Sequence, residues 1–106
     1  MKPVRFTRRA ETEIERAAAW YEKRSEGLGE KFLGRVKEAV QSIAINPLGY
    51  AAGVGGARRC LVPRFQDALY FMVEPDESIV IGCLHSKRNP ILAKERALGV
   101  RPIDPS

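Results

Sequence analysis

The sequence has few of the residues that metal sites and nucleophilic enzymes use. Its 106 residues include two cysteines, Cys60 and Cys83, and one histidine, His85. Two cysteines are too few for a disulfide framework, they lack metal-ligand spacing, and one histidine cannot complete a ligand set. We therefore expect no metal, no cofactor and no hydrolytic triad, and we interpret both cysteines as small buried thiols.

Motifs for phosphate loops and membranes are also missing. Gly53-Val54-Gly55-Gly56 leads into Arg58-Arg59, whereas a phosphate-binding loop leads into Lys-Ser and a helix. No apolar run is long enough to cross a bilayer, and the first residues lack the apolar region of a signal peptide. These absences predict a cytoplasmic protein without membrane contact.

The composition is that of one folded domain. Hydrophobic residues make up 44% of the chain and charged residues 29%, which is ordinary for a globular protein. We expect a single domain over residues 1–106, with an irregular tail over 99–106. The net charge of +5 favours an acidic partner, either nucleic acid or an acidic protein segment, although a merely solvated basic surface gives the same charge.

The first half of the chain predicts a strand and a helical hairpin. Val4 to Phe6 alternates as a short strand, and Thr7 can cap the helix that follows. Apolar residues then recur at helical spacing in two stretches: Ala10, Ile14, Ala17, Ala18 and Tyr21, then Leu28, Phe32, Val36, Ala39, Val40 and Ile43. Gly27 and Gly29 permit a tight reversal between the helices, and Asn46-Pro47 ends the second helix.

The second half predicts a β-meander. A glycine-rich loop over 48–57 precedes three strand-like segments over 59–62, 68–73 and 79–85, the last two joined by a Pro-containing turn. Residues 89–98 predict a short helix capped by Asn89. The expected fold class is α+β, with the helices covering one face of a three-stranded antiparallel meander.

The middle strand of this meander is apolar on both sides. Leu69, Phe71 and Val73 alternate with Ala68, Tyr70 and Met72. Strands of this kind are buried on both faces, yet two helices cover only one face of so small a sheet. The other face is covered either by the C-terminal residues Ile91, Leu92 and Leu98 or by a partner, and we favour a partner.

Two basic groups flank the meander. Arg58, Arg59 and Arg64 lie in or beside its first strand, and His85, Lys87 and Arg88 follow its last strand. An arginine offers a planar donor fork for a carboxylate or a phosphate. If the first and last strands lie near each other, the two groups share a binding patch. Alternatively, Lys87 and Arg88 only solubilise a turn, or pair with Glu77 or Glu95.

Six short motifs follow one another along the chain. They are Trp20-Tyr21-Glu22, Gly27-Leu28-Gly29 with Phe32, Asn46-Pro47-Leu48-Gly49-Tyr50, Arg58-Arg59-Cys60-Leu61, Leu69-Tyr70-Phe71-Met72-Val73 and His85-Ser86-Lys87-Arg88-Asn89-Pro90. In this order and spacing, they resemble the ParE/RelE superfamily of bacterial toxins from type II toxin–antitoxin systems. The resemblance runs from about residue 3 to residue 96.

The resemblance implies the same strand, two-helix and meander fold, and it implies a protein partner. Toxins of this group act in the cytoplasm and are wrapped by a cognate antitoxin, often through a helix followed by an extended strand. A toxin–antitoxin hetero-oligomer is therefore expected. The antitoxin would cover the second sheet face at Ala68, Tyr70 and Met72.

Two branches of the superfamily differ in activity. RelE-like toxins cut messenger RNA on the ribosome, whereas ParE-like toxins inhibit DNA gyrase without nuclease chemistry. Of the basic positions that the nuclease branch uses, Arg59 and Arg88 match. Leu61, Ala68 and Lys94 stand where the branch has basic residues or a tyrosine.

The ParE-like branch is therefore favoured. A gyrase-binding surface would draw on Arg58, Arg59, Arg64, His85, Lys87, Arg88 and Arg96. The alternative is a ribosome-dependent endoribonuclease, with Arg59, His85 and Arg88 around the scissile phosphate. A domain of this fold that has lost toxicity or acts on another target is the third hypothesis.

Overall fold

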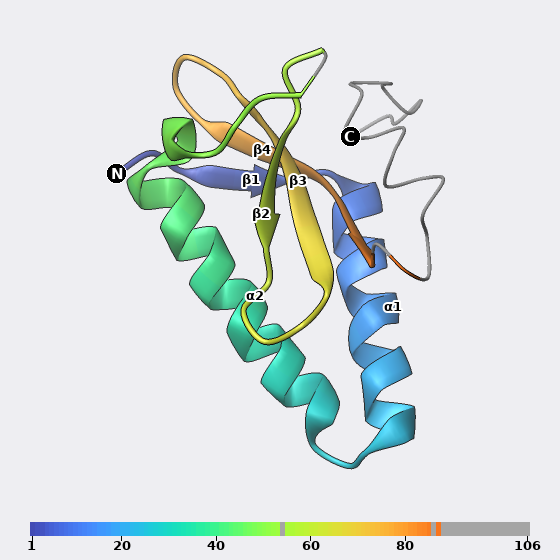
Figure 1. Ribbon diagram of the computed structural model, residues 1–106. Coiled ribbons are helices and arrows are strands. Elements are labelled where there is room, and N and C mark those ends of the chain that lie inside the picture. The colour runs from blue at the N-terminus through green and yellow to red at the C-terminus, as the bar shows by residue number, and fades with distance from the viewer. Residues whose placement is uncertain (54, 86, 88–106) are drawn as a thin grey trace.

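Two helices pack as an antiparallel hairpin against a four-stranded sheet (Figure 1). The computed structural model describes residues 1–53, 55–85 and 87. The elements in chain order are β1 (Val4–Phe6), α1 (Arg8–Arg24), α2 (Leu28–Ile45), the 3₁₀ turn η1 (Pro47–Gly49), β2 (Arg58–Leu61), β3 (Asp67–Val73) and β4 (Ser78–His85). This order confirms the predicted α+β fold. The short helix expected over 89–98 and the tail over 99–106 lie outside the described residues.

The predicted helix boundaries are set by local hydrogen bonds. Thr7 Oγ1 accepts the N–H of Ala10 at 3.1 Å and so caps α1, as the sequence predicted. Gly27 adopts a φ of 83°, which glycine takes without strain, and α2 begins directly after it. Asn46 ends α2 before Pro47. The hairpin is therefore specified by residues at its own ends.

One side chain of α1 also holds the start of α2. The two carboxylate oxygens of Glu22 accept the N–H groups of Gly27 and Gly29, each at 2.9 Å. Both bonds hold the pKa of Glu22 below its ordinary value of 4.5, and the bond from Gly27 has the larger effect. The carboxylate thus caps α2 from the neighbouring helix. A Cβ at Gly29 would lie 2.7 Å from the carbonyl oxygen of Ala18, so the helices approach closely here.

The sheet order is β1-β4-β3-β2. β2, β3 and β4 form the predicted antiparallel meander, and β1 joins as a fourth strand, parallel to β4. Strand β4 is therefore central, while β1 and β2 are the two edges. Since β3 lies between β2 and β4, the first and last strands of the meander are not neighbours.

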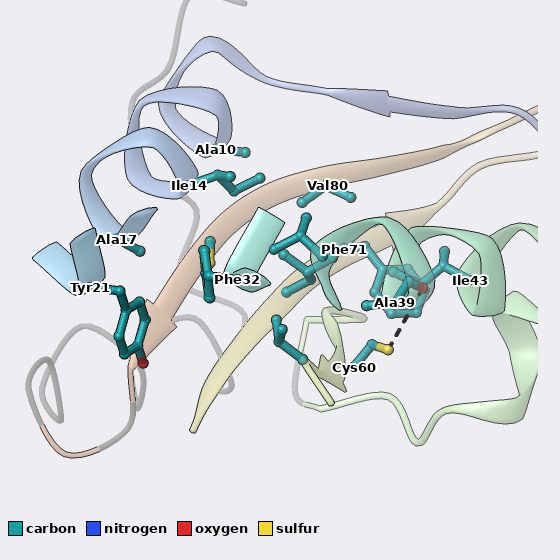
Figure 2. Close-up of a cluster of buried hydrophobic side chains, with 14 residues drawn as sticks. Ala10, Ile14, Ala17, Tyr21, Phe32, Ala39, Ile43, Cys60, Phe71 and Val80 are labelled. Carbon is teal, nitrogen blue, oxygen red and sulfur yellow. Dashed lines mark hydrogen bonds between the residues drawn. The ribbon is translucent and has the colours of Figure 1, made fainter. Parts of the chain in front are cut away.

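The main core lies between the helices and one face of the sheet (Figure 2). Phe32 of α2 and Phe71 of β3 are fully buried, and Tyr21, Phe32 and Phe65 contact one another with ring centroids 4.7–5.1 Å apart. Cys60 and Cys83 are free thiols buried at this core, which confirms their predicted packing. The helical stripes and the alternating strand residues therefore form one cluster.

The second face of the sheet carries a smaller cluster. Ala68, Tyr70 and Leu84 are buried here, with Ile81 packed against them. The chain alone leaves only 3% of Ala68 and 2% of Tyr70 exposed, whereas Met72 is half-buried. The open apolar surface expected at Ala68 and Tyr70 is therefore not found. The antitoxin contact assigned to Ala68, Tyr70 and Met72 stays a prediction.

Candidate protein-binding surface

The three arginines around β2 point in different directions. Arg58 is half-buried and donates from its guanidinium to the carbonyl oxygen of Tyr50. Arg59 lies opposite Tyr70 in the ladder, so its exposed side chain is on the second face of the sheet. Arg64 is exposed in the turn between β2 and β3, with a φ of 66°. These residues surround one strand without forming one patch.

The second basic group begins at the other end of the meander. His85 ends β4 and lies opposite Asp67 in the ladder, on the helix-facing side that Cys83 also shares. Its Nδ1 accepts the N–H of Lys87 at 3.1 Å, and the side chain of Lys87 is exposed. Arg88 and Arg96 fall outside the described residues. The hydrogen bond to His85 thus holds the backbone of Lys87 close to the end of β4.

The structure does not bring Arg59 and His85 together. Arg59 faces the second side of the sheet from the edge strand β2, whereas His85 faces the helices from β4, with β3 between the two strands. A shared basic patch required the first and last strands of the meander to lie near each other, and for Arg59 and His85 they do not. A single scissile phosphate cannot contact both side chains across the sheet, which disfavours the nuclease alternative.

The first residue of β3, Asp67, is an acidic residue that the sequence did not single out. Asp67 is 1% exposed, and its carboxyl group accepts a hydrogen bond from the hydroxyl of Tyr21 on α1. Tyr21 had been assigned only to the apolar stripe. In the sequence, the one signal for this contact is the position of Asp67, a charged residue directly before a segment that is apolar on both faces.

Two open grooves run between α2 and the β2 region. One, of about 360 Å³, is lined by Ala39, Ser42, Tyr50, Arg59, Cys60, Leu61 and Pro63. The other, of about 540 Å³, is lined by Leu28, Lys31, Gly34, Arg35, Glu38, Arg64 and Phe65. Both mix apolar side chains with basic ones. They are suited to a polypeptide segment, because each has an apolar floor beside exposed cationic groups.

Neither groove offers a reactive nucleophile. Burial raises the pKa of the Cys60 thiol, and its Sγ donates to the carbonyl oxygen of Ala39. Hydrogen bonding to Cys60 also raises the pKa of Tyr50, so both groups stay neutral at pH 7. Among the described residues, no three His, Cys, Asp or Glu side chains gather as a metal site. The same part of the chain contains no helix long and apolar enough to span a membrane.

Comparisons with known proteins agree with this fold. A family described as "ParE toxin of type II toxin-antitoxin system, parDE" matches residues 4–90. A solved structure titled "Chromosomal ParDE TA system from P. aeruginosa" is similar, with a TM-score of 0.57 and 20% identity, over 80% of this chain and 96% of that one. No curated protein matches the sequence significantly.

Proposed function

This chain belongs to the ParE toxin family of type II toxin–antitoxin systems, and we propose that it inhibits DNA gyrase by binding and is neutralised by a cognate antitoxin. The toxin would act in the cytoplasm as the free protein and be stored as a toxin–antitoxin complex. The observation that carries the choice of binding over RNA cleavage is the placement of Arg59 and His85 on opposite faces of the sheet.

The target-binding surface would centre on the end of β4. Lys87 is exposed just after β4, where its N–H donates to His85, the last residue of the strand, and at this end β4 pairs with β3 through His85 and Asp67. A positive side chain at this place attracts an acidic target and speeds its association. Arg88 and Arg96, which follow in the sequence, would extend this surface. Arg58, Arg59 and Arg64 would contribute from the β2 side.

The test is a supercoiling and DNA-cleavage assay with purified gyrase and the purified chain. The proposal expects loss of supercoiling at micromolar chain and accumulation of cleaved DNA, both reversed by the antitoxin. Primer extension on translated messages is run in parallel. If messages are cut within codons and supercoiling is unimpaired, the gyrase proposal is wrong and ribosome-dependent RNA cleavage is the function.

Induced expression without the antitoxin gives the cellular readout. Growth arrest is expected from the free toxin and normal growth from co-expression. Normal growth with the chain alone, when the purified chain is folded, would contradict the toxin role and favour a domain that has lost toxicity.

A further inference from the structure

The last residues of β4 extend past the end of β1. The parallel pairing of the two strands runs from Ser78 to Val80, and it ends where Thr7 donates its N–H to the carbonyl oxygen of Val80 at 3.0 Å. In the part of the chain that the structure describes, no strand pairs with residues 81–85 on this side. Helix α1 follows β1 directly and packs against β4 (Figure 1). The end of β4 therefore has a strand on one side and a helix on the other.

An extra residue in β4 sets the direction of the Cys83 backbone. The carbonyl oxygen of Val80 faces β1, since it accepts the bond that ends that strand. Backbone groups alternate in a regular strand, so a residue three positions later would face β3. The register with β3, however, shifts between Val80 and Gly82 and leaves Ile81 unpaired. Because of this extra residue, Cys83 turns its N–H away from β3 and toward α1.

Glu13 of α1 accepts this N–H. Its Oε1 lies 2.9 Å from the backbone nitrogen of Cys83, which is 70 residues away in the chain. Cys83 is 4% exposed and Glu13 is half-buried, so water competes little for the bond. A buried backbone N–H without a partner costs at least as much as a lost hydrogen bond. The side chain of Glu13 thus supplies the acceptor that a neighbouring strand would otherwise provide.

The bond lies just before the part of β4 that is proposed to meet the target. His85 follows Cys83 by two residues and pairs with Asp67 of β3. The Nδ1 atom of His85 accepts the N–H of Lys87 at 3.1 Å, which ties Lys87 to the strand end. The course of the chain from Cys83 to Lys87 is therefore set by β3 on one side and by Glu13 on the other.

We propose that Glu13 is a positioning residue for target binding: its carboxylate holds the course of β4 after the extra residue Ile81 and so places Lys87 against the target. The inference rests on the proposed function, because it takes gyrase as the target and Lys87 as a contact. Glu13 acts through the backbone of Cys83, and its side chain does not itself contact the target. The role requires a hydrogen-bond acceptor at this place, which an amide oxygen also supplies.

The first experiment compares three variants of the full chain by NMR. Glu13→Ala removes the acceptor, Glu13→Gln keeps an acceptor without the charge, and Glu13→Asp keeps the charge but shortens the reach. Amide exchange at Cys83, measured relative to the buried Leu69 of β3, should become about tenfold faster or more in the alanine and aspartate variants and stay within about twofold in the glutamine variant. The amide signal of Lys87 should shift in the same two variants. If Glu13→Ala does not fold, Glu13→Asp decides.

The second experiment measures gyrase inhibition by the same variants. Glu13→Ala should raise the concentration needed for half-inhibition about tenfold, whereas Glu13→Gln should stay within about twofold of the unchanged chain. Thr7→Ala is the matched control, because it removes the cap of α1 and so lowers stability without removing the bond to Cys83. It should inhibit like the unchanged chain. Since Glu13 is proposed to act through Lys87, adding Glu13→Ala to Lys87→Glu should cause no further loss.

Unchanged exchange at Cys83 in Glu13→Ala and Glu13→Asp would overturn the inference. Faster exchange with unimpaired inhibition would overturn it too, as would an equal loss of inhibition in Glu13→Gln or Thr7→Ala, or additive losses from Glu13→Ala and Lys87→Glu. The inference and the proposed function fail separately. If the unchanged chain does not inhibit gyrase, the proposed function is wrong, and the amide signal of Lys87 then decides whether Glu13 holds this end of β4.

Discussion

Tyr21 and Asp67 join the last turn of α1 to the start of β3, although 46 residues separate them in the chain. The hydroxyl of Tyr21 donates to the carboxyl group of Asp67, which is buried. The ring of Tyr21 also contacts Phe32 and Phe65, with centroids 5.1 Å and 4.7 Å away. A single side chain thus connects α1, α2, the β2–β3 turn and β3.

Replacing Tyr21 with phenylalanine isolates the polar part of this contact. Tyr21→Phe keeps the ring packing and removes the donor to a buried carboxyl group, so we expect a loss of about 1–3 kcal/mol in the free energy of unfolding. Urea denaturation measures it. A double-mutant cycle with Asp67→Asn should give a coupling energy above about 0.5 kcal/mol. Additive effects would show that the bond contributes nothing to stability.

Two glycines of α2 should respond in opposite directions to alanine. A Cβ at Gly29 meets the Ala18 backbone at 2.7 Å, so Gly29→Ala should destabilise the chain by about 1–3 kcal/mol by forcing the helices apart. Gly34 is exposed within α2, and a Cβ there meets nothing within 4 Å. Gly34→Ala should therefore stabilise the chain by about 0.5–1 kcal/mol. Thermal unfolding of both variants tests the pair, and equal effects would contradict the close helix approach.

The cap formed by Glu22 predicts a pH dependence. The folded pKa of this carboxyl group lies below its value in the unfolded chain, so its stabilisation is fully present above about pH 4.5 and is lost as the pH falls through the lowered value. The melting temperature of Glu22→Gln should lie below that of the unchanged chain at pH 7 and should approach it at pH 3. Glu26→Gln, a nearby exposed change that makes neither bond, serves as the control. A constant difference across this range would exclude the ionised cap.

Lys87 should matter for the target more than for the fold. It is exposed after β4, so Lys87→Glu should leave the melting temperature within a few degrees of the unchanged chain. Reversal of its charge should raise the toxin concentration needed for half-inhibition of gyrase about tenfold or more. Lys37→Glu, on an exposed position of α2, is the matched control. If both variants change the concentration for half-inhibition equally, Lys87 is not part of the target-binding surface.

Much of the secondary structure follows from signals that are local in the sequence. Thr7 caps α1 through a neighbour three residues away, and Asn46-Pro47 ends α2. The alternation around Leu69 and Tyr70 also predicted two buried sheet faces correctly, since each of these residues belongs to a different core cluster. Signals of this kind depend only on periodicity and on the chemistry of adjacent residues.

The unpredicted features depend on distant residues or on small irregularities. The parallel pairing of Val4 with Ser78 joins chain segments that carry no common local pattern. The ladder between β3 and β4 also shifts register after Tyr70, so Ile81 is an extra residue in β4. Strand alternation alone would have placed Ile81 with Cys83, yet it packs against the cluster of Tyr70 and Leu84.

The sequence shows which basic residues are neighbours in the chain, but it does not predict which of them share a surface. Arg59 and Arg64 lie five residues apart, yet Arg59 belongs to the second sheet face and Arg64 to a turn beside α2. Which of them can meet the same partner depends on the direction of each side chain. That direction follows from the register of β2, which no local pattern specifies.

The central place of β4 has a consequence for synthesis. This strand is the last of the described elements to be made, and it alone joins β1 to the rest of the sheet. A nascent chain can form its helical hairpin early, but the sheet cannot close until residues 78–85 have left the ribosome. A toxin built in this way gains its working shape only after β4 has been made, and fragments released before β4 are expected to remain harmless.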